Sequence, residues 1–184
     1  MKGLIKSLNV ILCFAFAATL TFSAAGIESY KKWDPEVVKI FEAMPVQEEG
    51  RLKPMQTVAR YKLMRINNSK RLRFEVSGEK VKVSAAEWLM DCLFRPEVAK
   101  KMPIFKVNNP AVIEAIGVTP HNSPRERYSY EEISSVPDAM KELSERTGEL
   151  GKIMEDSDKE EEGKEARRDP INAGLLSLKS AVNE

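Results

Sequence analysis

Apolar residues along the chain recur mostly at helical spacing, in short runs separated by turns. Such runs follow Pro35, Pro54, Ser84 and Pro137. Asp34 is a suitable N-cap for the first helix, because its carboxylate can accept from free backbone N–H groups and Pro35 fits the first helical position. Ser84 and Glu87 have the spacing of a capping box, which predicts a second well-defined helix start.

One segment instead alternates apolar and polar residues. Leu72, Phe74 and Val76 precede Ser77-Gly78-Glu79, and the alternation resumes in 81–83. A period of two around a Gly-containing turn predicts a short β-hairpin. A second strand candidate lies at 104–107. The predicted fold class is therefore mainly α with a small β-hairpin (α+β).

Two further short helices are predicted before residue 135. Asn109 precedes a proline and caps one of them, which should stop at Gly117. Ser129 should cap the other, which runs through Ile133. We expect one compact domain over 27–134.

The composition changes beyond Pro137. Met140, Leu143, Leu150 and Met154 recur at helical spacing and predict an amphipathic helix, whereas 155–168 is almost wholly charged or polar. We expect that charged part to be solvated or disordered, and a last short helix to begin after 169. The segment 137–184 is therefore predicted to be an amphipathic and charged helical tail.

The N-terminus has the pattern of an export signal. Lys2 and Lys6 precede an apolar run over 8–22, and small residues follow at 23–26. We expect 1–25 to act as a signal peptide and the protein to be periplasmic or extracytoplasmic. The run falls short of the about 20 apolar residues of a membrane span. Two outcomes stay open: cleavage, or retention as an anchor in the cytoplasmic membrane.

The totals exclude several classes of protein. Two cysteines, Cys13 and Cys92, and one histidine, His121, do not supply a multi-cysteine zinc site or a C-x-x-C-H haem attachment. A formal net charge of +1 does not favour nucleic acid as a partner. We expect no catalytic residues, no metal, no cofactor and no small-molecule substrate, hence not an enzyme.

Two side chains, His121 and Cys92, carry groups that could take part in chemistry. His121 lies in a polar loop without a visible partner, so an ordinary surface histidine is favoured over a haem ligand or a general base. Cys92 shares a helix face with Trp88 and Leu89, which favours a buried small hydrophobic residue over a reactive thiol.

Proline and glycine, the residues typical of turns, are concentrated in 44–60, which is M-P-V-Q-E-E-G-R-L-K-P-M-Q-T-V-A-R. Pro45, Gly50 and Pro54 predict an ordered turn region rather than a helix or strand, because each proline fixes its φ and Gly50 tolerates a positive φ. A helix should follow, with Tyr61 among its apolar residues. The other residues of that apolar face are Val58, Leu63, Met64 and Ile66.

This stretch resembles a known family. P-V-Q-E-E-G-R-L-K-P-M-Q-T-V-A-R is similar to the P-V-Q-x-x-G-R-x-K-P-x-x-T-x-A-R motif in an extracytoplasmic domain of Ccs-type (system II) cytochrome c assembly proteins. The likeness continues through 85–89, 103–110 and 128–133. Gln56 and Val58 depart from it: the family often has Asp at the first position and a bulkier apolar residue at the second.

The resemblance implies a non-catalytic module of cytochrome c biogenesis that is membrane-associated and docks onto a membrane-embedded, haem-handling synthase. The synthase part itself is not expected within this chain. The residues carried over as a partner-binding or scaffold turn are Pro45, Gln47, Gly50, Arg51, Lys53, Pro54, Thr57 and Arg60. Two roles stay open for the cations, contact with an anionic group or local pairing with Glu48 and Glu49. The alternative function is a periplasmic adaptor unrelated to haem, which would pair through its C-terminal amphipathic helix.

Overall fold

The computed structural model describes residues 27–121, 127–155 and 160–184, and it is mainly helical. The helices are α2 (Pro35–Ala43), α3 (Met55–Asn67), α4 (Ala85–Phe94), α5 (Pro96–Ala99), α6 (Pro110–Glu114), α7 (Tyr130–Ser134), α8 (Ala139–Glu155), α9 (Glu160–Arg168) and α10 (Pro170–Val182). The strands are β1 (Pro45–Glu48), β2 (Arg51–Pro54), β3 (Arg71–Val76), β4 (Glu79–Ser84), β5 (Phe105–Lys106) and β6 (Arg127–Tyr128). The strands pair antiparallel, β1 with β2, β3 with β4, and β5 with β6. The predicted fold class is confirmed.

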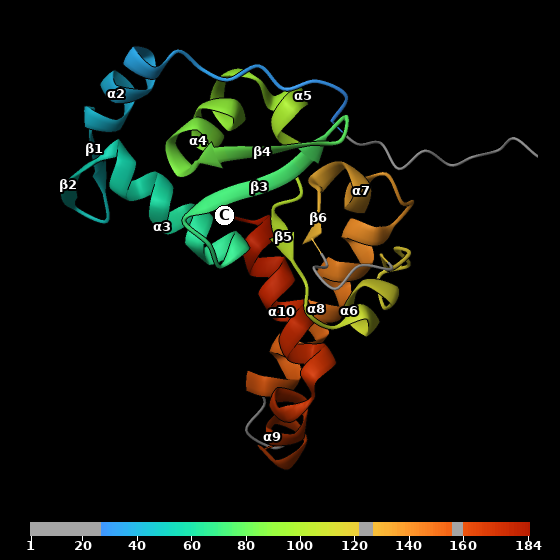
Figure 1. Cartoon of the computed structure of the whole chain (residues 1–184). Coiled ribbons are helices and arrows are strands. Elements are labelled where there is room, and N and C mark those ends of the chain that lie inside the picture. The colour runs from blue at the N-terminus through green and yellow to red at the C-terminus, as the bar shows by residue number, and fades with distance from the viewer. Residues whose placement is uncertain (1–26, 122–126, 156–159) are drawn as a thin grey trace, which may run out of the picture.

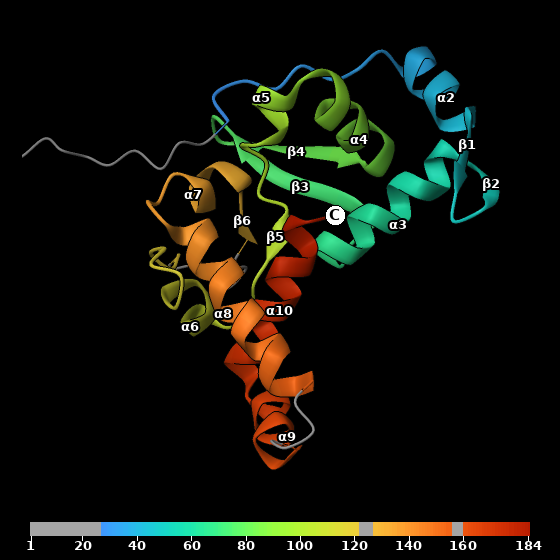
Figure 2. The ribbon, with the colours of Figure 1, turned by 180° about the vertical axis from the view of Figure 1, so that it is seen from behind.

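The β3–β4 hairpin crosses the middle of the molecule (Figure 1). Helices α4 and α5 lie on one side of it, and α3 and α10 lie on the other. Helix α2 and the β1–β2 hairpin form one end of the molecule. Helices α8 and α10 pack against each other and extend away from the body toward α9, as the reverse view in Figure 2 also shows.

The predicted hairpin is confirmed as β3–β4. Leu72 pairs with Val83 across the two strands, and both are buried. Ser77 and Gly78 take φ values of 52° and 85°, the left-handed pair that a two-residue hairpin turn requires. The hairpin places one apolar face against the core, which explains why the alternation was visible in the sequence.

The prediction of a turn region without strands in 44–54 is wrong. Residues 45–48 and 51–54 form a hairpin, and Glu49 and Gly50 take φ values of 53° and 74° in its turn. Pro45 and Pro54 face each other at its open end, where the Met55 N–H donates to the Met44 carbonyl at 2.8 Å. Because neither face is buried in a core, these strands carry no apolar alternation that a sequence pattern could show.

Helix α3 follows as predicted, and Asn68 ends it with a φ of 52°. Leu63 and Ile66 are buried, but Tyr61 is 64% exposed, so its predicted place on the apolar face is wrong. Tyr61 lies two positions from both Ala59 and Leu63, about 200° around the helix. Ala59, fully buried, takes the core position instead.

Side-chain caps fix most of the other helices where the sequence predicted them. Asp34 accepts from the Glu36 N–H at 2.8 Å, and Ser84 and Ser129 each complete a capping box. Asn109 and Asp169 accept from the N–H groups of Ala111 and Ile171. These caps depend on neighbours within three residues, so the sequence alone shows them.

One hydrophobic core includes the C-terminal helices. Leu143 of α8 and Leu175 and Leu178 of α10 are buried in the same cluster as Leu63 and Val83. The segment separated as a tail in the sequence is thus, in part, core. Residues 160–168 of its charged stretch form helix α9 rather than irregular chain. The predicted signal peptide, 1–25, lies outside the described residues.

Candidate functional site

Helix α2 carries apolar side chains on two faces. Phe41 packs with Ala86 and Met90 of α4, so it holds the helix to the body. Val37, Ile40 and Met44 follow the i, i+3, i+7 spacing of a second stripe, and all three are exposed. Ile40 is 68% exposed. Within the part of the chain that the structure describes, one apolar face of α2 therefore has no packing partner.

The β1–β2 hairpin follows this stripe directly in the chain. Leu52 is 78% exposed at its rim, next to the exposed cation Arg51. Both hairpin and helix lie at the same end of the molecule (Figures 1 and 2). We call the exposed side chains of Val37, Ile40, Met44, Arg51 and Leu52 the α2–hairpin surface.

Lys53 pairs with both glutamates of the hairpin turn. Its ammonium group lies 3.2 Å from a Glu49 carboxylate oxygen and 3.5 Å from one of Glu48. The hydrogen bond to Glu49 raises the pKa of Lys53 above its usual value. Local pairing, one of the two roles left open for the cations, therefore applies to Lys53.

The motif residues divide into three groups in space. Pro45, Gly50, Lys53 and Pro54 shape the hairpin, while Gln47 and Arg51 are exposed on it. Thr57 is half-buried in the first turn of α3. Arg60 lies farther along α3 and is exposed toward a different feature, a surface cavity. The structure therefore does not bring all eight residues into one site.

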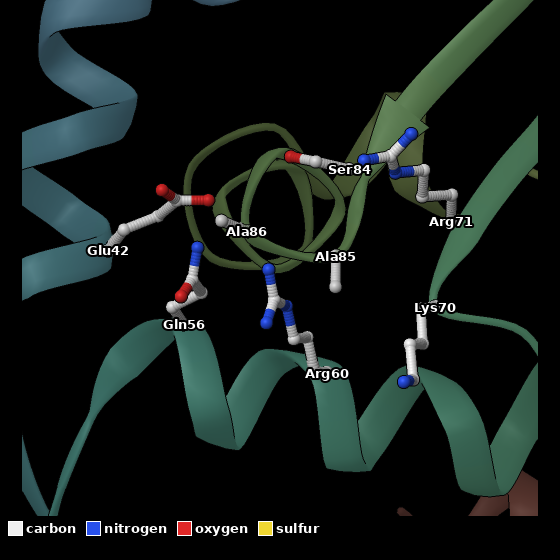
Figure 3. A pocket seen from close by; sticks show the side chains of 8 residues that line it. All are labelled: Glu42, Gln56, Arg60, Lys70, Arg71, Ser84, Ala85 and Ala86. Atoms are coloured by element: carbon white, nitrogen blue, oxygen red, sulfur yellow. The ribbon is translucent and has the colours of Figure 1, made fainter.

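The cavity beside Arg60 has a volume of about 450 Å³ (Figure 3). Figure 3 shows Arg60 pointing from α3 toward the first turn of α4, and Arg71 extending beside Ser84. Its lining consists of Glu42, Gln56, Arg60, Lys70, Arg71, Ser84, Ala85 and Ala86. Lys70 and Arg71 were not singled out from the sequence, because only the fold brings the start of β3 next to α3 and α4.

A buried carboxylate that sequence reasoning missed ties the N-terminal segment to the body. Asp91 is fully buried and accepts from Tyr30 Oη at 2.9 Å and from Trp33 Nε1 at 2.8 Å. Arg95 completes the arrangement with an ion pair to Asp91 at 2.6 Å, and its guanidinium lies 3.9 Å from the Trp33 ring centre. Burial raises the pKa of Asp91, and the hydrogen bonds from Tyr30 and Trp33 oppose that shift.

Cys92 and His121 both lie against other residues of the fold. Cys92 is half-buried against the core, and burial raises the pKa of its thiol to about 11. His121 is partly exposed and stacks on Tyr128 at 4.5 Å, and its Nε2 lies 3.1 Å from a Glu132 carboxylate oxygen. Glu132 could not be recognised from sequence as a partner of His121, because the fold brings the two residues together.

Comparison with protein-family models and with curated proteins finds no match to this chain. Within 27–121, 127–155 and 160–184, no group of three or more potential metal-ligating side chains comes together. In the same ranges, no helix has both the length and the apolar character that a membrane crossing needs.

Proposed function

We propose that this chain is a non-catalytic extracytoplasmic module of cytochrome c biogenesis, which docks onto a membrane-embedded haem-handling synthase through the α2–hairpin surface. The observation that carries the docking role is the exposed apolar stripe of α2, together with the exposed Leu52 on the hairpin at the same end of the molecule. The partner is suggested by the resemblance of 45–60 to the Ccs-type motif, which covers this same hairpin.

Physical chemistry supports recognition at this surface. Exposed apolar side chains that lie together on one face are typical of protein interaction sites, whereas single ones are common everywhere. Arg51 adds a cation at the rim, where charged groups guide association more than they add affinity. The local pairing of Lys53 keeps the turn in shape without a partner, so the surface is preorganised for binding.

The adaptor alternative has less support, because it needs a free apolar face on α8. Leu143 and Leu150 are buried, and α8 packs against α10 of the same chain. The face that would pair with a partner helix is already covered. No observation within the described residues therefore favours that role over docking through the α2–hairpin surface.

Affinity capture from the protein's own membranes tests the proposal. Ile40→Ser combined with Leu52→Ser should remove capture of a polytopic haem-handling protein, identified by mass spectrometry. Tyr130→Ser is the matched control, because Tyr130 is 42% exposed but lies on α7 in the body. Both variants should keep the circular dichroism spectrum of the unmodified protein.

Undiminished capture by the Ile40→Ser/Leu52→Ser protein would overturn the docking role of this surface. Recovery of soluble proteins alone, from the unmodified chain, would overturn the proposed partner.

A further inference from the structure

The cavity beside Arg60 is strongly cationic for its size. Arg60, Lys70 and Arg71 line it, and Glu42 is the one carboxylate in the lining. Three positive groups against one negative group leave two positive charges. Like charges held near one another destabilise a folded protein unless anions compensate them.

Within the described residues, these three cations take part in no ion pair, although several other cations of the chain do. Lys62 and Arg65 both pair with Glu184, and Arg95 pairs with Asp91. Lys100 lies near both Glu97 and Glu131. Arg60, Lys70 and Arg71 thus remain free to bind a group from outside the chain.

The three cations come from two places that the fold brings together. Arg60 lies on α3, one helical turn after Gln56, so both side chains face the cavity. Lys70 and Arg71 lie at the junction of α3 and β3. Two guanidinium groups approaching from separate elements can each donate two hydrogen bonds to one oxyanion.

The first turn of α4 supports the same chemistry. Its capping box satisfies the N–H groups of Ser84 and Glu87. The N–H groups of Ala85 and Ala86 belong to the first turn, where helix geometry provides no intrahelical partner. Both residues line the cavity, and the positive end of the helix dipole adds to the field of the three cations.

We propose that this cavity is a binding site for an oxyanion, a phosphate or carboxylate group, held by Arg60, Lys70 and Arg71. The volume of about 450 Å³ exceeds that of one such group, so the rest of the ligand lies toward Gln56 and Glu42. The ligand is either a free small molecule or the headgroup of an anionic lipid. The site is independent of the α2–hairpin surface, because the two share no residue.

The free-ligand arm of the test is an amide NMR titration of the full chain with inorganic phosphate and with succinate, at neutral pH and constant ionic strength. We expect saturable shifts at Ala85 and Ala86. Arg60→Gln combined with Arg71→Gln should weaken binding at least about tenfold, since charge-assisted hydrogen bonds are lost. Arg73→Gln, on the same strand as Arg71 but outside the cavity, should change affinity less than about twofold.

The lipid arm is co-sedimentation with phosphatidylglycerol vesicles, with phosphatidylcholine vesicles as the neutral comparison. Binding to the anionic vesicles alone, lost in the Arg60→Gln/Arg71→Gln protein, would assign the oxyanion to a headgroup. Saturable binding of phosphate or succinate would assign it to a free molecule. If neither arm distinguishes the double variant from Arg73→Gln, the site does not exist.

Discussion

The body of the molecule and its α2 end differ in how far their apolar residues are buried. In the body, Leu63, Leu72, Val83 and Leu143 are essentially inaccessible to solvent and share one core. At the α2 end, a small cluster around Phe41 is buried, while Ile40 and Leu52 stay exposed. The buried residues of the body form its hydrophobic core, whereas Val37 and Ile40 of α2 leave much of their apolar surface exposed among the described residues. This difference is the basis of the proposal that the α2–hairpin surface contacts another molecule.

Asp91→Ala is expected to have the largest effect, because Asp91 connects Tyr30 and Trp33, in the segment before α2, to the body. It leaves Arg95, Tyr30 and Trp33 without their shared acceptor. We expect a loss of roughly 3–5 kcal/mol in the free energy of unfolding. Urea denaturation followed by tryptophan fluorescence measures it. A loss below about 1 kcal/mol would show that the contacts of Asp91 do not hold the N-terminal segment to the body.

The reactivity of the Cys92 thiol measures how well the folded body protects this residue of α4 from solvent. Its pKa of about 11, against 9.0 for an ordinary thiol, leaves about a hundredfold less thiolate at neutral pH. Iodoacetamide should label the native protein at least that much more slowly than the urea-unfolded protein. The folded pKa is the higher one, so the stability it contributes is present below pH 9.0 and lost as pH rises through about 11. Equal labelling rates for the native and the unfolded protein would show that the fold does not protect Cys92.

Substitutions at two glycines test how closely the C-terminal helices pack against the body. A Cβ on Gly174 would clash with Val112 Cγ2, whereas one on Gly148 meets nothing nearby. Gly174→Ala should cost about 1–3 kcal/mol through overpacking. Gly148→Ala should instead stabilise the protein by about 0.5–1 kcal/mol through helix propensity. Thermal unfolding of both variants measures the contrast, and similar melting temperatures would contradict it.

The two hairpin turns offer the smallest but most specific comparison. Gly50 and Gly78 have φ values of 74° and 85°, and neither has space restrictions around it. Alanine should strain either turn by about 1–2 kcal/mol. Gly78→Ala should lower global stability, because β3–β4 contributes to the core. Gly50→Ala should leave the urea midpoint unchanged and reduce hydrogen-exchange protection only in 45–54. A global loss from Gly50→Ala would show that the β1–β2 hairpin belongs to the cooperative body.

Much of the body could be predicted from sequence because its signals are local. The capping box at Ser84 and the alternation around Ser77-Gly78 each involve a few neighbouring residues. The β1–β2 strands were missed because they pair without burying a face. The position of Tyr61 was mistaken because a loose apolar spacing does not say which side of α3 meets the core.

The candidate sites were harder to predict than the fold. The motif in 45–60 pointed to Arg60, but it predicted that Arg60 belongs to the same turn as Arg51. The cavity that Arg60 lines also needs Lys70 and Arg71, which lie outside the motif. Asp91 was missed because two of its three partners, Tyr30 and Trp33, lie 61 and 58 residues away, and its i,i+4 spacing to Arg95 alone does not show that the carboxylate is buried. The sequence also could not show that Ile40 is exposed while Phe41 is buried, because both residues fit the helical spacing of apolar positions.

The most direct measurement of the docking claim is photo-crosslinking in native membranes, with a photoreactive residue placed at Ile40, at Leu52 or at Tyr130. We expect a crosslink to a polytopic haem-handling protein from positions 40 and 52, and none from position 130 on α7. Crosslinks to such a protein only from position 130, or from none of the three, would contradict the assignment of the α2–hairpin surface.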